Sequence, residues 1–359
     1  MDLSPRKTRA QRRRQQEQQQ QQQLKVQETA PNPNTPTTKS PQPVFYQAPN
    51  LASFRPKLMR PDKSSNVWAE QSPAEQALLQ HKQDLLAQQA ATLQASIPKD
   101  FLELNHGRTV YSTLIFSREE AGTAVMIRED GLILTCAHCV ADTRQDFESQ
   151  NIKDKVFWLL EPSGLVFRAK CIAWDPVRDL ALLGFFWYSP RKRAIQPRAM
   201  LAAFPSGARQ PDMPRWVQFD HVKLAGSSPA VDAPLVCVGH PGAEDLETSR
   251  RGVKTGYDVL HVSTGAFRGI AEGQDAQDNE EIGSLMHDCW TYWGHSGSPL
   301  LDRETGKLVG LHSSWDDETG MRRGVPIESI NEFLTLCNID LESIEDKMMR
   351  NKNVQDNSG

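Results

Sequence analysis

Three short motifs in this chain contain the side chains that a serine nucleophile needs. His138 lies in residues 134–139 (Leu-Thr-Cys-Ala-His-Cys), Asp179 in residues 178–183 (Arg-Asp-Leu-Ala-Leu-Leu), and Ser296 in residues 294–299 (Gly-His-Ser-Gly-Ser-Pro). A serine hydroxyl is a weak nucleophile at neutral pH, so it needs a base to take its proton and a third group to orient that base. We expect His138 to be the base, Asp179 the orienting carboxylate and Ser296 the nucleophile.

The glycines around Ser296 indicate how a negative charge on the reacting oxygen could be stabilised. Glycine permits a tight turn, which would expose the hydroxyl of Ser296 and direct the backbone N–H groups of Gly294 and Ser296 toward one point. Those two amides are the predicted oxyanion hole.

Each motif has a plainer interpretation when it is taken alone. A histidine among apolar residues is often a core residue, Gly-x-Ser-Gly occurs by chance in turns, and Asp179 could simply end a loop, with Asp175 as a competing carboxylate. The order His, Asp, Ser, with each residue at the edge of an apolar run, favours the catalytic interpretation.

With these motifs the chain resembles the trypsin-like serine peptidase superfamily, for which this triad is the standard example. The resemblance covers about residues 107–336. Its pattern is closest to bacterial glutamyl endopeptidases and high-temperature-requirement proteases, which have counterparts of residues 238–242 (Val-Gly-His-Pro-Gly) and 309–312 (Val-Gly-Leu-His). The resemblance implies an all-β fold, with two packed six-stranded antiparallel β-barrels, a C-terminal helix and an active site between the barrels.

Two departures from the family pattern restrict this expectation. Extracellular trypsins carry an aspartate just before the nucleophile, where it receives a new amino terminus after activation cleavage, but this chain has His295 there. Activation of that kind is therefore not expected. The residues after Leu336 are too few for the peptide-binding domain that follows many high-temperature-requirement proteases.

The resemblance also implies a specificity pocket, at the positions of Thr291 and His312. In glutamyl endopeptidases a threonine and a histidine at these motif positions bind a substrate carboxylate, which predicts cleavage after glutamate or aspartate. The alternative is that His312 is only a strand residue. Asp316 and Asp317 would repel an acidic substrate if they faced the cleft. A preference for basic residues is less favoured, because the position that is acidic in trypsins appears in this chain as Trp290.

Composition divides the chain into four parts. Residues 1–68, with glutamine in nearly every position from 15 to 23 and a proline-rich stretch over 31–43, have too little apolar surface to order the chain, and we expect them to be disordered. Residues 69–100 are expected to form a helix and linker, residues 101–340 the peptidase domain, and residues 341–359 a polar tail. Within the domain, barrel one is expected over 107–188, the connection over 189–214 and barrel two over 215–336.

The segment before the domain has the signature of a helix start. Ser72, Pro73 and Glu75 predict an N-cap, a first-turn proline and a capping box. The leucines that follow recur near helical spacing, at positions 78, 79, 85, 86 and 93. We expect this apolar stripe to pack on the peptidase body, with pairing to a second chain as the alternative.

Barrel two is expected to use strands over 217–224, 234–239, 259–267, 285–292, 299–301 and 308–312, followed by a helix over 327–337. Residues 271–282, rich in aspartate and glutamate, are expected to be a solvated loop.

Charge is distributed unevenly along the chain. Residues 1–100 contain 14 lysines and arginines against 8 aspartates and glutamates, whereas the remainder contains 27 against 37. The basic run from Arg6 to Arg14 predicts a nuclear import signal, with nucleic-acid binding possible but not favoured because no aromatic residues are interleaved. Protein or peptide substrates are the expected partners, without membrane binding, and the oligomeric state is left open.

The amino terminus has no secretory pattern, and no run of apolar residues is long enough for a membrane span. We therefore expect an intracellular protein, nuclear or cytoplasmic and not secreted. Cys136 and Cys139 flank His138, and no earlier cysteine supplies the disulfide partner found in secreted relatives. A zinc or redox role for this pair is not favoured, and we expect no cofactor and no metal.

The sequence predicts a serine endopeptidase that acts through an acyl-enzyme. The alternative is a catalytically silent, protease-like interaction or scaffolding module, since fold alone does not decide between the two.

Overall fold

The computed structural model describes residues 44–49, 51, 71–118, 122–188, 219–248, 250 and 252–341. Residues 244–254 belong to a separate unit, in which Glu244 and Lys254 form a single antiparallel bridge. All the elements below belong to the other unit, which includes residues 44–243 and 255–341. The predicted tail over 1–68 lies outside the described residues except for 44–49 and 51, as do the connection over 189–214 and all but the first residue of the C-terminal tail.

Six antiparallel strands close the first barrel, in the order β6-β5-β2-β3-β4-β7, with β7 returning to pair with β6. Their buried faces are rich in leucine, isoleucine, valine and phenylalanine, which suit a strand that packs inward. A short strand β1 extends this sheet by pairing with β6. The strands are β1 (Tyr46–Gln47), β2 (Thr113–Phe116), β3 (Thr123–Arg128), β4 (Leu132–Thr135), β5 (Val156–Leu160), β6 (Val166–Asp175) and β7 (Leu180–Tyr188).

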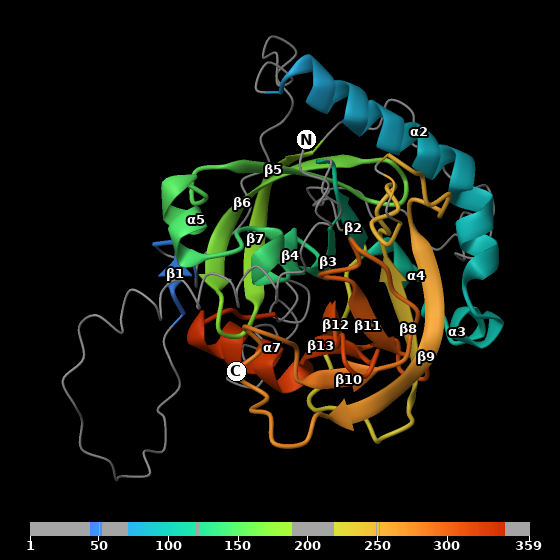
Figure 1. Ribbon diagram of the computed structural model, residues 1–359, viewed down its shortest axis with the longest axis vertical. Helices are drawn as coiled ribbons and strands as arrows, with labels where there is room; N and C mark the ends of the chain where they lie inside the picture. The colour runs from blue at the N-terminus through green and yellow to red at the C-terminus, as the bar shows by residue number, and fades with distance from the viewer. Residues whose placement is uncertain are drawn as a thin grey trace, which may run out of the picture. The chain divides into compact units, whose positions relative to one another are not determined.

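The second barrel is also closed and six-stranded, in the order β10-β13-β12-β11-β8-β9 (Figure 1). Its strands are β8 (Pro234–Gly239), β9 (His261–Ile270), β10 (Leu285–His287), β11 (Pro299–Asp302), β12 (Leu308–Trp315) and β13 (Arg322–Pro326). The predicted fold class, with two six-stranded barrels and a C-terminal helix, is confirmed.

The strand assignment within the second barrel is wrong at three points. Residues 219–224 make only one bridge, from Leu224 to Leu308, because the amides of Phe219 and Val222 donate to carbonyls of the first barrel. The strand expected over 285–292 ends at His287. The sixth strand is β13, which the sequence analysis did not predict.

The helices of the described residues are short apart from α2. They are α2 (Pro73–Ser96), α3 (Lys99–Glu103), α4 (Gly107–Tyr111), the 3₁₀ turn η3 (Ala137–Cys139), α5 (Arg144–Ser149) and α7 (Ile327–Leu336). None of them is both long and apolar enough to cross a membrane.

The predicted start of α2 is confirmed in detail. The Ser72 hydroxyl accepts a hydrogen bond from the amide of Glu75, and the Glu75 carboxylate accepts one from the amide of Ser72. Leu79, Leu86 and Leu93 are buried and belong to the main hydrophobic core. The apolar stripe therefore packs on the body of the same chain.

The acidic loop over 271–282 exposes most of its aspartates and glutamates, as expected, but one buried residue anchors it. Asn279 is fully buried; its side-chain carbonyl accepts from the amide and hydroxyl of Ser284, and its side-chain amide donates to the hydroxyl of Ser329 in α7. The Asn279 amide donates to the carbonyl of Val177, in the turn between β6 and β7. One buried polar residue thus fixes a loop whose charged residues suggested solvent exposure.

The two kinds of contact in α2 predict losses of stability of different size. Ser72→Ala removes the capping hydrogen bond from the Glu75 amide and the bond from the hydroxyl to the Glu75 carboxylate, both at an exposed helix end, and is expected to lower the free energy of unfolding by about 1 kcal/mol. Leu86→Ala leaves a cavity in the core and is expected to lower it by about 2–5 kcal/mol. Urea denaturation followed by tryptophan fluorescence measures both, and equal losses would contradict the packing of α2 on the body.

Candidate active site

His138 and Asp179 are brought together by the pairing of two strands. β4 and β7 are antiparallel neighbours in which Thr135 lies opposite Ala181. His138 follows the end of β4 in η3, and Asp179 immediately precedes β7, so both side chains lie at the same end of the strand pair.

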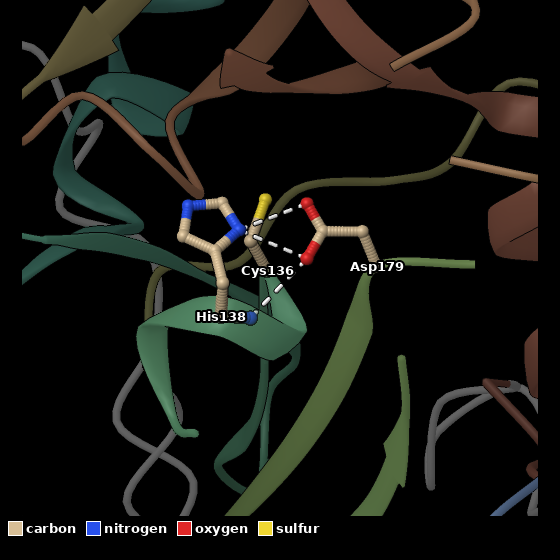
Figure 2. Close-up of side chains that lie close together, drawn as sticks. All are labelled: Cys136, His138 and Asp179. Carbon is tan, nitrogen blue, oxygen red and sulfur yellow. Dashed lines mark hydrogen bonds and ion pairs between the residues drawn. The ribbon is translucent and has the colours of Figure 1, made fainter. Parts of the chain in front are cut away.

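The two side chains form a buried hydrogen-bonded pair (Figure 2). His138 Nδ1 lies 2.9 Å from both carboxylate oxygens of Asp179, and the His138 amide donates to Oδ1 at 3.2 Å. The Asp179 side chain is 0 % exposed and that of His138 is 14 % exposed. Because a carboxylate only accepts, Nδ1 carries the proton, and the other ring nitrogen of a neutral imidazole is left as a base.

Two further contacts fix the Asp179 carboxylate. The hydroxyl of Ser313, on β12 of the second barrel, donates to Oδ2 at 2.6 Å. The backbone of Asp179 has φ 53°, in the left-handed region that few residues other than glycine, asparagine and aspartate adopt. The competing carboxylate, Asp175, does not contact His138; it accepts from the guanidinium of Arg178 at 2.7 Å and from two amides of the same turn.

Ser296 lies in a tight loop between β10 and β11. The flanking Gly294 and Gly297 have φ of 100° and 85°, and a Cβ on Gly297 would lie 2.0 Å from the carbonyl oxygen of Thr123. The Ser296 hydroxyl donates to the carbonyl oxygen of Ser313 at 3.0 Å and not to His138. The Ser296 proton must therefore be redirected away from Ser313 before His138 can take it.

The predicted oxyanion amides are available to an acceptor. Within the part of the chain that the structure describes, neither the Gly294 nor the Ser296 N–H donates a hydrogen bond. The preceding carbonyl, of Trp293, accepts from the amide of Gly242 at 2.6 Å. Since the C=O and N–H of a trans peptide point in opposite directions, this bond directs the Gly294 N–H away from Gly242.

The predicted pocket residues Thr291 and His312 are both buried, but no hydrogen bond joins them in the described chain. His312 Nδ1 instead lies 3.0 Å from Nε2 of His287. Burial, with a contribution from Arg322, lowers the pKa of His287 to about 3. Burial, together with the neighbouring His287, holds the pKa of His312 well below its ordinary value, so both rings are neutral at pH 7.

The acidic residues near the pocket are engaged elsewhere. Asp316 accepts hydrogen bonds from the amides of Glu318 and Thr319 in the turn between β12 and β13. Asp288 pairs with Arg268 and accepts from the amide of Ala266. Neither carboxylate is therefore free to act as the floor of a pocket for basic residues.

Cys136 completes a cluster whose donor types suit zinc. Its thiol, a ring nitrogen of His138 and a carboxylate oxygen of Asp179 lie within 4.8 Å of one another (Figure 2). A metal ion bound through Nδ1 would displace the proton that Asp179 accepts. The cluster can therefore hold either the hydrogen-bonded pair or an ion, but not both.

The sequence identified the motif and pocket residues but did not indicate three residues that hold them or the loop around Ser296 in place. Ser313 orients Asp179, His287 orients His312, and Thr123 donates from its amide to the Ser296 carbonyl and from its hydroxyl to the Gly294 carbonyl. One indication of Ser313 was present in the sequence: it is next to His312, on the strand after Ser296 that was expected to line the pocket.

Comparison with known proteins gives one match to a family model and several structural likenesses. A model described as a trypsin-like peptidase domain matches residues 122–311. No curated protein sequence matches the chain.

Similar solved structures include an inactive form of Rv3671c from M. tuberculosis, at 15 % identity and a TM-score of 0.40, which covers 65 % of this chain and 91 % of that chain. The serine endoprotease from Yersinia pestis is 15 % identical, with a TM-score of 0.43 and coverage of 67 % and 68 %. Deg5 is 17 % identical, with a TM-score of 0.43 and coverage of 67 % and 97 %.

The buried histidines predict loss of stability in acid. His240, His287, His295 and His312 all have a pKa lowered chiefly by burial, so the unfolded chain binds more protons than the folded one below about pH 6.5. Their contribution is present above that pH and is lost as the pH falls; for His287, with its pKa of about 3, the loss at pH 5 is about 2 kcal/mol.

Urea denaturation at pH 8, 6.5 and 5 measures this loss. His287→Leu removes one of the four rings, so the decrease in unfolding free energy between pH 8 and pH 5 should be smaller than in the wild type by about 2 kcal/mol. An equal decrease in both proteins would show that His287 is not held neutral.

Proposed function

The chain belongs to the trypsin-like peptidase family, and from this premise we propose that it is a serine endopeptidase that acts through a His138–Asp179–Ser296 triad. The observation that carries the proposal is the buried pair in which His138 Nδ1 lies 2.9 Å from both oxygens of Asp179. This pair leaves the second ring nitrogen of His138, which points away from Asp179 in Figure 2, as a base.

The proposed reaction begins with rotation of the Ser296 hydroxyl from the Ser313 carbonyl toward His138. Ser296 Oγ attacks the peptide carbonyl carbon as its proton passes to His138, and the charged imidazolium is stabilised by Asp179. The oxyanion accepts hydrogen bonds from the amides of Gly294 and Ser296.

Collapse of the tetrahedral intermediate breaks the C–N bond, and His138 returns the proton to the leaving amine. The acyl group stays on Ser296. A water molecule then gives a proton to His138 and attacks the ester carbonyl, which releases the carboxylic acid and regenerates the hydroxyl.

We propose a preference for glutamate or aspartate before the scissile bond, with Thr291 and His312 as the recognising side chains. If His287 Nε2 donates to His312 Nδ1, the neutral His312 presents an N–H on its Nε2, and this N–H can donate to a substrate carboxylate. Asp316 accepts from the amides of Glu318 and Thr319, which hold its carboxylate in its own turn although it keeps its negative charge.

One observation favours a second candidate, a protease-like binding module that keeps the triad without using it. The Ser296 hydroxyl donates to Ser313 and not to His138. Catalytic hydrogen bonds are often long or misaligned before substrate binds, so this contact does not exclude catalysis.

A fluorophosphonate probe separates the two candidates. Wild-type protein is expected to gain the mass of one phosphonyl group at Ser296, and Ser296→Ala is expected to gain none, because only an activated serine reacts rapidly. Intact-protein and peptide mass spectrometry measure the labelling. A wild-type chain that stays unlabelled and leaves a mixed peptide library uncut would contradict the endopeptidase proposal.

The specificity proposal has its own test, made with matched peptides that carry glutamate or glutamine before the cleaved bond. Wild-type kcat/KM is expected to favour glutamate, and His312→Phe is expected to reduce this preference by about 10-fold or more, because the substrate carboxylate loses its donor. Thr291→Val should reduce it in the same direction. A wild-type enzyme that cuts both peptides equally would contradict an acidic pocket while leaving the endopeptidase proposal intact.

A further inference from the structure

The buried face of α2 contains two polar side chains among its leucines. Lys82 and Gln89 fall on the same helical stripe as Leu79, Leu86 and Leu93, at spacings of three and four residues. α2 runs beside β9 of the second barrel (Figure 1). Hydrophobic packing does not require a glutamine or a lysine on this face, so their hydrogen bonds indicate what the helix holds in place.

Gln89 begins a chain of hydrogen bonds that ends at the nucleophile loop. Its side-chain carbonyl accepts from the amide of Val259 at 2.7 Å, and the carbonyl of Val259 lies 2.6 Å from Nδ1 of His240. The amide of His240 donates to the hydroxyl of Thr123 at 3.0 Å, and that hydroxyl donates to the carbonyl of Gly294 at 3.1 Å.

The direction of each bond in this chain is determined by chemistry. The Val259 carbonyl can only accept, so Nδ1 of His240 carries the proton. Burial holds the pKa of His240 well below its ordinary value, so the ring is neutral and has this single N–H. The hydroxyl of Thr123 has one proton, which it donates to Gly294 while it accepts from His240. Each donor and acceptor in this series therefore has one partner. Removing any one group leaves its neighbour without a hydrogen bond.

Residues 240–242 also orient the Gly294 amide, which is proposed to bind the oxyanion. Two residues further along, the amide of Gly242 donates to the carbonyl of Trp293, which sets the direction of the Gly294 N–H on the same peptide. Thr123 holds the carbonyl on the other side of Gly294. Gly242 thus fixes the peptide before Gly294 directly. His240 fixes the peptide after Gly294 through the hydroxyl of Thr123.

Close packing makes this segment sensitive to displacement. A Cβ on Gly239 would lie 2.1 Å from the hydroxyl of Ser298 and 2.3 Å from the ring of His295, so the end of β8 has no free space against the nucleophile loop. A shift of the backbone at His240 would therefore move the loop that contains Ser296.

Lys82 gives α2 a second contact near the site, in the first barrel. Its ammonium group donates to the carbonyls of Phe116 and Arg118 at 2.8 Å each. The Arg118 guanidinium in turn donates to the carbonyl of Cys139, the residue after His138. The helix is therefore bonded to segments that support both the base and the nucleophile loop.

We propose that α2 is an activating element and that Gln89 is a positioning residue, acting through Val259, His240 and Thr123 on the oxyanion-binding amide of Gly294. This inference rests on the proposed endopeptidase function. In this proposal α2 supports catalysis, whereas a spacer would have no effect on the rate and an inhibitory segment would lower it.

The test compares Gln89→Ala with Gln88→Ala in the full chain. Gln88 is the exposed neighbour on the same helix, so its substitution changes the helix composition equally without touching the hydrogen-bond chain. The concentration of reactive Ser296 is titrated in each protein, and kcat and KM for an ester substrate are expressed per active site.

Gln89→Ala is expected to lower kcat per active site and the rate of fluorophosphonate labelling about 10-fold, with KM little changed. This is less than the 10²–10³-fold effect of removing an oxyanion donor outright, because the donor is displaced and not deleted. Gln88→Ala should match the wild type. Gln89→Glu, which keeps an acceptor for the Val259 amide, should restore most of the rate.

A double-mutant cycle tests the route of the coupling. Thr123→Val removes the hydroxyl at the far end of the chain while keeping a β-branched side chain in β3. If both residues act through one chain of bonds, the double variant should lose little more activity than Thr123→Val alone. Multiplicative losses would overturn the proposed route.

Hydrogen–deuterium exchange gives a readout that does not depend on turnover. Faster exchange in peptides covering residues 289–298 is expected for Gln89→Ala and not for Gln88→Ala. If wild-type protein is labelled at Ser296 but Gln89→Ala has wild-type kcat per active site and unchanged exchange, the positioning role is overturned and the endopeptidase proposal stands. If wild-type protein is not labelled at all, the endopeptidase proposal fails, and the role of Gln89 in catalysis fails with it.

Discussion

The arrangement of the site depends on the close contact between β3 of the first barrel and the nucleophile loop of the second. Thr123 donates from its amide to Ser296 and from its hydroxyl to Gly294, and its carbonyl lies where a side chain on Gly297 would have to be. The contact therefore combines hydrogen bonds with a steric limit that only glycine meets. Because His138 and Asp179 come from the first barrel and Ser296 from the second, their distances depend on this junction together with the hydrogen bond from Ser313 to Asp179.

Local sequence predicted the parts of the site that lie within a motif. The His138 and Asp179 motifs each adjoin a strand, and the pairing of these strands was enough to bring the two side chains together. Ser313 and Thr123 could not be found in this way, since a single hydroxyl residue in an apolar strand has no local signature and acts through a partner far along the chain. β13 was missed because Arg-Arg-Gly-Val-Pro lacks an alternating pattern, and its place is set by pairing with β10 and β12.

The second barrel buries polarity that its fold alone does not require. His287, His295 and His312 lie beside a small apolar core, and burial keeps their rings uncharged. Replacing both partners of a buried hydrogen bond with apolar groups of similar shape can be nearly neutral or stabilising, so the fold alone does not require these rings. Asn279 is another buried polar residue close to the site. Its hydrogen bonds join the loop over 271–282 to α7 and to the turn before Asp179.

The left-handed backbone of Asp179 limits how the chain can vary at this position. Most side chains would strain a residue at φ 53°, whereas asparagine is nearly as compatible with it as aspartate. Asparagine also has the same size, but its NH₂ group would replace one of the two oxygens that accept from His138 and Ser313, and it would no longer stabilise a charged imidazole. In evolutionary terms, a hydrolytic form and a form that only holds peptides are separated by one replacement that the backbone tolerates.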